Sequence, residues 1–175
     1  MKEILHLGID IGSTTIKLVL LDMENNIIYS KYERHYSNIK EAVVVFIKEV
    51  FKKYKDYNIT VMITGSSGLS LSKLLGVSFI QEVIACTEAV ETFMNNADVA
   101  IELGGEDAKI TYFEDSLEQR MNGVCAGGTG AFIDQMATLL ETNAKGLNEL
   151  AQNYKIIYPI AARCGVLQKL IYSLL

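Results

Sequence analysis

The 175-residue chain contains no uncharged apolar segment as long as the roughly 18 residues that a membrane-spanning helix requires. Its first residues, Met1 to Ile4, include an acid and lead straight into a strand-like run, unlike a signal peptide. Basic residues are in the minority, because 16 Lys and Arg stand against 21 Asp and Glu. Nucleic-acid binders usually present a basic face, and the lysine cluster between Lys48 and Lys55 has the helical spacing of a solvated face. We therefore expect neither a membrane nor a nucleic-acid partner.

Residues that commonly bind metals are also scarce, since the chain has two histidines and three cysteines. His6 and His35 lack the spacing of metal ligands, and no two cysteines form a Cys-x-x-Cys pair. An odd number of cysteines without a secretion signal indicates reduced thiols and a cytoplasmic protein. Cys86 falls on a predicted helix, where we interpret it as a packing residue.

The remaining composition is typical of a globular protein. Half of the residues are hydrophobic and 21% are charged, which leaves ample apolar side chain for a core. The length suits one ordinary domain or two small ones.

The first half of the chain begins with three strand-like runs joined by turn residues, which predicts an antiparallel meander. Apolar residues then recur at three- and four-residue steps, as in an amphipathic helix. The predicted elements are strands at 4–10, 16–22, 27–36 and 59–63 and helices at 39–55, 67–75 and 81–95.

The strand pattern restarts at Val99 and repeats a spacing seen in the first half. The predicted elements there are strands at 99–103, 108–114 and 118–124 and helices at 130–141 and 146–153. In both halves an acid ends a strand, a glycine follows it and a lysine lies in the next strand, at the same intervals. The first set is Asp10, Gly12 and Lys17, and the second is Glu102, Gly104 and Lys109. Two such hairpins, each opening a strand-strand-strand-helix series, predict a duplicated domain. We place the boundary near Asn96, which gives domains at 1–96 and 97–175.

The turn after the first strand has the residue types that bind a nucleotide phosphate. A glycine there lets the backbone approach a ligand closely, and consecutive N–H groups helped by hydroxyls can cradle phosphate oxygens. Asp10, at the strand end, can hold Mg²⁺ through water. We assign phosphate contacts to Gly12, Ser13, Thr14, Thr15 and Lys17. The alternative interpretation is a plain polar hairpin turn.

The second turn carries paired glycines, Gly104 and Gly105, flanked by acids. Two phosphate loops from two similar domains, facing each other across a cleft, would clamp a polyphosphate. Acids at that point can position a metal or orient an attacking water. A plain turn is again the alternative, but the matching spacing of the two loops favours the nucleotide site.

A third glycine-rich segment, 122–132, leads into a predicted helix, so free N–H groups and the positive end of the helix dipole gather beside Cys125. This setting favours a thiolate, which can be a nucleophile or a ligand of a soft metal centre. A small buried hydrophobic residue is an equal alternative. Cys164 lies between the cation of Arg163 and Gly165. With two candidate ligands in one chain, a four-ligand cluster would need two chains and hence a two-fold dimer.

Four segments taken together, 8–17, 104–109, 122–132 and 163–166, resemble the BadF/BadG/BcrA/BcrD-type ATPase family. This family contains the activator of 2-hydroxyglutaryl-CoA dehydratase and the ATPase subunits of benzoyl-CoA reductase, within the actin, hexokinase and chaperone ATPase superfamily. Residues 101–136 look closest to the first ATPase unit of a large multi-domain relative of that activator. The resemblance implies an α/β, ribonuclease H-like (actin-like ATPase) fold, in which a mixed five-stranded sheet flanked by helices is followed by an incomplete second copy.

The resemblance also implies a function and its site. In this family a homodimer shares one 4Fe-4S cluster through two cysteines from each subunit, which correspond to Cys125 and Cys164. ATP binding and hydrolysis, with Mg²⁺, drive a conformational change, and the cluster passes a low-potential electron to a partner dehydratase or reductase. Asp10 and Asp107, then Glu106, are the candidates for the acid that orients the hydrolytic water. The nucleotide-binding residues carried over are Gly12, Ser13, Thr14, Thr15, Lys17, Gly104, Gly105, Gly127 and Gly128.

Two departures from the family pattern concern the end of the chain. The family continues beyond residue 175 with an adenosine-binding glycine motif, so the resemblance implies an incomplete second domain and poor nucleotide affinity. After Val166 the family usually reads Phe-Ala-Lys-Ser/Thr-Asp-Ile, whereas this chain reads differently at 167–172. Deleting one base from codons for Val-Phe-Ala-Lys-Thr-Asp-Ile yields Val-Leu-Gln-Lys-Leu-Ile-Tyr, the sequence found here. We therefore hypothesise a one-base frame slip, which would leave 167–175 without functional information.

Two other functions stay open at this point. A small-molecule kinase of the same superfamily would share the phosphate loops, but it would need a sugar or acid pocket and has no role for the two cysteines. A non-catalytic module would bind a nucleotide or a partner weakly and turn nothing over, which agrees with the missing adenosine motif.

Overall fold

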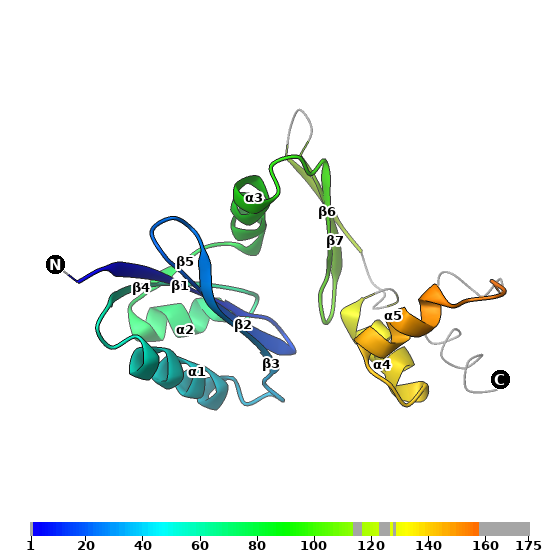
Figure 1. Ribbon diagram of the computed structural model, residues 1–175, viewed down its shortest axis with the longest axis horizontal. Coiled ribbons are helices and arrows are strands. Elements are labelled where there is room, and N and C mark those ends of the chain that lie inside the picture. The colour runs from blue at the N-terminus through cyan, green and yellow to red at the C-terminus, as the bar shows by residue number, and fades with distance from the viewer. Residues whose placement is uncertain (1, 114–116, 123–126, 128, 158–175) are drawn as a thin grey trace. The chain divides into compact units, whose positions relative to one another are not determined.

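The computed structural model of the protein describes residues 2–113, 117–122, 127 and 129–157. The chain divides into two compact units, Met1–Asn96 and Ala97–Leu175, and each is described by itself (Figure 1). The first unit contains β1 (Ile4–Ile11), β2 (Thr15–Leu21), β3 (Ile27–Arg34), α1 (Ile39–Lys53), β4 (Asn58–Thr64), α2 (Gly68–Leu75), β5 (Ser78–Phe79) and α3 (Glu82–Phe93). The second contains β6 (Val99–Leu103), β7 (Ala108–Tyr112), β8 (Glu118–Met121), α4 (Gly130–Leu139) and α5 (Ala144–Gln152).

The first unit is built on a mixed five-stranded sheet of order β3-β2-β1-β4-β5. β1, β2 and β3 pair antiparallel, which confirms the predicted meander, whereas β4 pairs parallel with both β1 and β5. β1 therefore lies at the centre of the sheet. β5 was not predicted, because a strand of two residues is too short to show an alternating pattern.

The core of the first unit lies between one face of this sheet and α1. Alternate residues of β1 are buried, and the cross-strand pairs Leu7–Leu20, Ile9–Leu18 and Ile11–Ile16 place a matching row on β2. α1 adds three buried side chains at helical spacing: Val43, Phe46 and Val50. Because successive side chains of a strand point to opposite faces, Asp10 and Lys17 lie on the face away from this core.

The second unit contains an antiparallel sheet of order β6-β7-β8, followed by α4 and α5. The predicted strands 108–114 and 118–124 end earlier, at Tyr112 and Met121, and the predicted helix 146–153 begins earlier, at Ala144. The earlier helix start has a clear cause, because the Asn143 side chain accepts a hydrogen bond of 3.0 Å from the Gly146 N–H and caps the helix.

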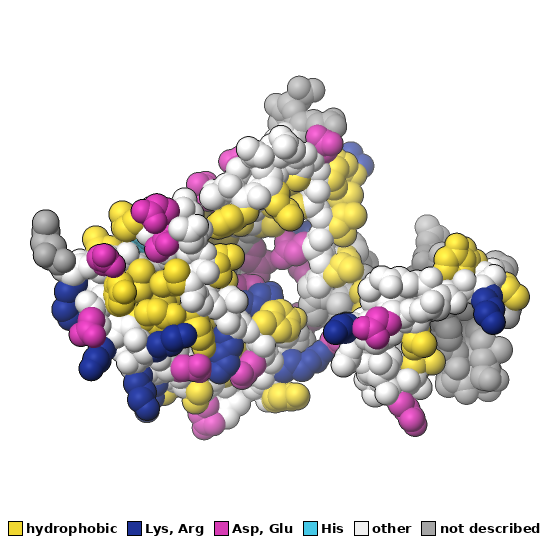
Figure 2. Space-filling view, viewed as in Figure 1, with side chains coloured by type: hydrophobic (Ala, Val, Ile, Leu, Met, Phe, Trp, Pro, Cys, Tyr) yellow, Lys and Arg dark blue, Asp and Glu magenta, His cyan; other side chains and the backbone are white. Residues whose placement is uncertain are grey.

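On the face that the space-filling view shows, acidic and basic side chains lie interspersed (Figure 2). Across the described ranges, no helix combines the length and the apolar character that crossing a membrane would take.

The buried aromatic ring of α1 provides a test of the core. Phe46 is 2% exposed, whereas Phe51 on the same helix is 46% exposed. We expect Phe46→Ala to lower the free energy of unfolding by about 3–5 kcal/mol, because it removes a fully buried ring and leaves a cavity. Phe51→Ala, the matched control, should change it by less than about 1 kcal/mol. Urea unfolding followed by circular dichroism measures both, and equal losses in the two variants would contradict this location of the core.

Candidate functional site

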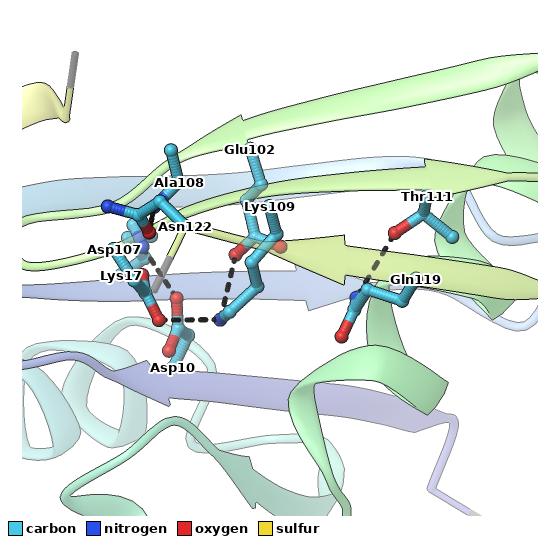
Figure 3. A network of polar contacts seen from close by, with 9 residues as sticks. All are labelled: Asp10, Lys17, Glu102, Asp107, Ala108, Lys109, Thr111, Gln119 and Asn122. Atoms are coloured by element: carbon cyan, nitrogen blue, oxygen red, sulfur yellow. Dashed lines mark hydrogen bonds and ion pairs between the residues drawn. The ribbon is translucent and has the colours of Figure 1, made fainter. Parts of the chain in front are cut away.

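The β1–β2 hairpin brings together an acid, a glycine turn and a lysine. Asp10 and Lys17 are directly opposite each other in the strand register, and the Lys17 ammonium donates to Asp10 Oδ2 at 2.6 Å (Figure 3). The Gly12 N–H donates to the Thr15 carbonyl at 3.0 Å and closes the turn. The side chains of Lys17 and Asp10 are 41% and 29% exposed, so both are accessible to a ligand.

The β6–β7 hairpin has the same backbone arrangement. The Gly104 N–H donates to the Asp107 carbonyl at 2.8 Å, and Glu102 lies opposite Lys109 in the register. The Lys109 ammonium lies 3.4 Å from Asp107 Oδ2 and 4.0 Å from Glu102 Oε1 (Figure 3). Its side chain is only 10% exposed. Lys109 was recognised in the sequence as part of the repeated spacing, but its contact with Asp107 was not foreseen.

The β4–α2 loop contacts the backbone of β1 next to the first turn, and no role was predicted for this loop. The Ser67 N–H donates to the Ile11 carbonyl at 3.0 Å. Gly65 has a φ of +99°, and a Cβ there would overlap the Ile11 carbonyl. The backbone of this loop therefore touches the strand end that carries Asp10 and Gly12. The run of glycine and serine after a buried strand was the available signal.

The second turn is supported by the start of α4. The Gly130 N–H donates to the Gly104 carbonyl at 2.8 Å, and a Cβ at Gly130 would lie 2.9 Å from the Leu103 carbonyl. Thr129, just before the helix, is completely buried. The second turn and the end of the third glycine-rich segment are thus in contact, which their separate positions in the sequence did not predict.

The remaining predicted site residues are placed as follows. Gly127 and Gly105 are half-buried, and Glu106 is exposed. Gly128, Cys125 and Cys164 lie outside the described residues. Within the described part of the chain, no group of three or more His, Cys, Asp and Glu side chains is arranged to hold a metal ion.

The two turn glycines differ in what they accommodate. A Cβ at Gly104 would lie 2.5 Å from Asp107 Oδ1, because this carboxylate lies over the glycine backbone. A Cβ at Gly12 would lie 3.4 Å from the Thr15 carbonyl, which is close to an ordinary contact. The Asp107 carbonyl oxygen would lie 3.1 Å from a Cβ at Gly104, so the hairpin leaves less room at 104 than at 12. Close approach of a ligand would explain a glycine at 12.

A hydroxyl next to Asp10 bears on the predicted Mg²⁺. Thr64 pairs with Asp10 in the parallel register of β1 and β4, and its Oγ1 is buried without a hydrogen-bond partner among the described residues. Carboxylate oxygens and coordinated waters are the groups that Mg²⁺ prefers, and a hydroxyl can accept a hydrogen bond from such a water. This donor set fits a hydrated Mg²⁺ ion.

His35, for which no role was predicted, contacts the first turn. The imidazole is 5% exposed, and its Nε2 lies 3.1 Å from the Gly12 carbonyl. Its backbone N–H donates to the Thr14 carbonyl at 3.3 Å. A single histidine at a strand end carries no signal for such a contact, because its partner lies 23 residues away in the sequence.

The sheet order of the first unit and the pair of acid-glycine-lysine hairpins are those of a protein with the actin-like ATPase fold. The chain belongs to the BadF/BadG/BcrA/BcrD ATPase family, which it matches over residues 7–173. The family and the fold inferred from the sequence segments are thus confirmed.

Named relatives and solved structures agree with this membership. The chain is 30% identical over 164 residues to the uncharacterized protein MJ0004 of Methanocaldococcus jannaschii, covering 91% of this chain and 65% of that protein. It is 28% identical over 171 residues to the (R)-2-hydroxyglutaryl-CoA dehydratase activating ATPase of Acidaminococcus fermentans, covering 94% of this chain and 64% of the relative. The chain therefore spans slightly less than two thirds of the length of these relatives.

Two solved structures extend the comparison to three dimensions. Component A of the Acidaminococcus fermentans (R)-2-hydroxyglutaryl-CoA dehydratase superposes with a TM-score of 0.83 at 26% identity, covering 97% of this chain and 67% of that one. The activator of the 2-hydroxyisocaproyl-CoA dehydratase from Clostridium difficile, with bound ADPNP, superposes with a TM-score of 0.79 at 24% identity, covering 95% and 63%.

The family match also bears on the frame-slip hypothesis. It extends to residue 173 and so includes most of the segment 167–175, which the hypothesis treats as unrelated to the family. The frame slip stays a prediction, which sequencing the coding DNA decides.

The support of the first turn can be tested with two glycines that both have positive φ. Gly65→Ala should lower the free energy of unfolding by about 3 kcal/mol or more, because the new methyl group would overlap the Ile11 carbonyl. Gly76, with a φ of +64° and no atom within 4 Å of an added Cβ, is the matched control. Gly76→Ala should cost only roughly 1–2 kcal/mol of backbone strain. Urea unfolding of both variants measures the difference, and equal losses would exclude the contact.

Proposed function

We propose that the protein is an ATP-dependent activator that couples ATP to low-potential electron transfer, from a 4Fe-4S cluster shared by two chains to a 2-hydroxyacyl-CoA dehydratase or a related reductase. The observation that carries the proposal is the pair of hairpins, in which an acid faces a lysine and a glycine N–H closes the turn. Membership of the family and relatives named as dehydratase activators support it.

ATP is the proposed ligand of the β1–β2 turn. Lys17 pairs with Asp10, and its exposed side chain lets a phosphate oxygen approach the ammonium. Gly12 leaves room for close approach of the phosphates, and nothing among the described residues accepts a hydrogen bond from the N–H groups of Ser13 and Thr14. Backbone N–H groups in a turn form a concave site for anions. The ADPNP bound to the Clostridium difficile activator is a nucleotide of this class.

Mg²⁺ bound through water to Asp10 would neutralise part of the phosphate charge during hydrolysis. Asp10 then holds the coordinated waters, and the unpartnered hydroxyl of Thr64 accepts a hydrogen bond from one of them. The same carboxylate can orient an attacking water.

The second turn supplies the other candidate acids. Asp107 is held over Gly104 by Lys109 at 3.4 Å, so its carboxylate has a defined position. Glu106 is exposed, which leaves it less well placed to orient a water. We therefore rank the acids Asp10, Asp107 and Glu106, and assign phosphate contacts in the second unit to Gly104, Gly105, Gly127 and Gly128.

The cluster is proposed on the chemistry of the cysteines and on the family. Thiolates are the ligands that iron-sulfur clusters take, and one chain supplies two, Cys125 and Cys164. A homodimer would supply the other two. A bound cluster would store the low-potential electron. Cysteines that stay reduced, as ligands of a cluster require, suit a cytoplasmic protein.

Removal of the lysine ammonium tests ATP binding. We expect Lys17→Ala to raise the Kd for Mg-ATP roughly tenfold or more, because it removes a charge-assisted contact with the phosphates. Lys145→Ala, on a side chain that is 86% exposed, should leave the Kd unchanged. Isothermal titration calorimetry measures both. A wild-type protein without heat of binding would reject ATP as the ligand, and binding without turnover would favour a non-catalytic module.

The cluster is tested by anaerobic reconstitution, with iron and sulfide quantified per chain. We expect one cluster for each pair of chains in the wild-type protein and a large loss in Cys125→Ala, because a thiolate ligand is removed. Cys86→Ala, at a half-buried position on α3, should keep the full content. Full iron and sulfide in Cys125→Ala would contradict the assignment. Transfer of phosphate to a sugar without iron would favour a kinase instead.

A further inference from the structure

We propose that His35 is a positioning residue, whose Nε2–H holds the Gly12 carbonyl and thereby sets the β1–β2 turn in its phosphate-binding conformation. The inference rests on the proposed binding of ATP at this turn, but it concerns a buried side chain that contacts the turn backbone and not the ligand. His35 directly follows β3, and its imidazole is 5% exposed.

The hydrogen bonds of the ring determine where its proton lies. The Ser37 N–H donates to Nδ1 at 3.1 Å, so this nitrogen is an acceptor and carries no proton. The neutral imidazole then has its proton on Nε2, which lies 3.1 Å from the Gly12 carbonyl and donates to it. The ring therefore links the turn to the chain that leads from β3 to α1.

Fixing this carbonyl also fixes the direction of an N–H group. The Gly12 carbonyl and the Ser13 N–H belong to one planar trans peptide unit, so they point in opposite directions. When the carbonyl is turned toward the buried imidazole, the Ser13 N–H points away from it. No described group accepts a hydrogen bond from that N–H, which leaves it available to an anion.

The backbone of His35 engages a second carbonyl of the same turn. Its N–H donates to Thr14 at 3.3 Å, so both the Gly12 and the Thr14 carbonyls are occupied by one residue. A carbonyl oxygen carries partial negative charge and would repel a phosphate. His35 thus donates one hydrogen bond to each of these carbonyl oxygens and directs both of them toward itself.

The other side of the ring supports an unusual piece of backbone. Tyr36 and Ser37 have φ values of 47° and 65°, in the left-handed region that non-glycine residues rarely adopt. The hydrogen bond from Ser37 to Nδ1 stabilises this turn. The two ring nitrogens therefore have separate tasks, which two substitutions can distinguish.

His35→Asn and His35→Gln form a matched pair. The Asn side chain places an oxygen near the position of Nδ1 and keeps the acceptor for Ser37, but its amide is too short to reach Gly12. The Gln side chain is longer and can place an N–H donor near the position of Nε2. We expect His35→Asn to raise the Kd for Mg-ATP about tenfold and His35→Gln to stay near the wild-type value.

Inorganic tripolyphosphate, which lacks the nucleoside, should show the same order of affinities. Equal Kd values in the wild type and both variants would overturn the proposal. Equal losses in both variants, together with equal falls in Tm, would reduce His35 to a structural role and would overturn it as well.

Amide ¹H–¹⁵N spectra without nucleotide test the same contact independently of ATP. The Ser13 signal should shift in His35→Asn and return toward the wild-type position in His35→Gln. If the wild-type protein binds neither ATP nor tripolyphosphate, the proposed function fails, while these spectra still decide the role of His35. Should His35→Asn not fold, a changed Ser13 signal in His35→Gln would by itself count against the proposal.

Discussion

The alternation of side chains along β1 is the constraint on which both the core and the candidate site depend. Leu7, Ile9 and Ile11 pack against α1 on one face of the sheet. Asp10 lies between two of them and therefore points to the other face, opposite Lys17. A shift of the β1–β2 register by one residue would bury the acid and expose the core side chains. The packing energy of the core thus also holds the acid and the lysine together.

The hairpins were predictable from the sequence because strand geometry is short-range and regular. Ile9, Asp10 and Ile11 belong to a strand, and a tight turn at Gly12 reverses the chain. A residue seven positions after Asp10 then lies opposite it on the next strand, and this residue is Lys17. The same reasoning applies to Glu102 and Lys109, which the structure places in register. Helix α1 was predictable for a similar reason, since its apolar residues recur at helical intervals over several turns.

What the sequence did not reveal depends on contacts between distant segments. The approach of Gly65 to Ile11 and of His35 to Gly12 joins loops that have no periodic pattern. A glycine or a histidine in a loop has many possible roles, and only the folded backbone selects one. The short strand β5 was missed for a different reason, because its two residues owe their strand conformation to pairing with β4.

The two turns share their closing hydrogen bond but differ in the segments that support them. The first turn rests on the β4–α2 loop and on His35, neither of which includes a candidate cluster ligand. The second is bonded through Gly104 to Gly130, the first residue of α4. In the sequence Cys125 precedes Gly130 by one short glycine-rich segment. Gly104 is therefore joined by one hydrogen bond to the helix that this segment precedes in the sequence, whereas no such bond to a helix start supports Gly12 among the described residues.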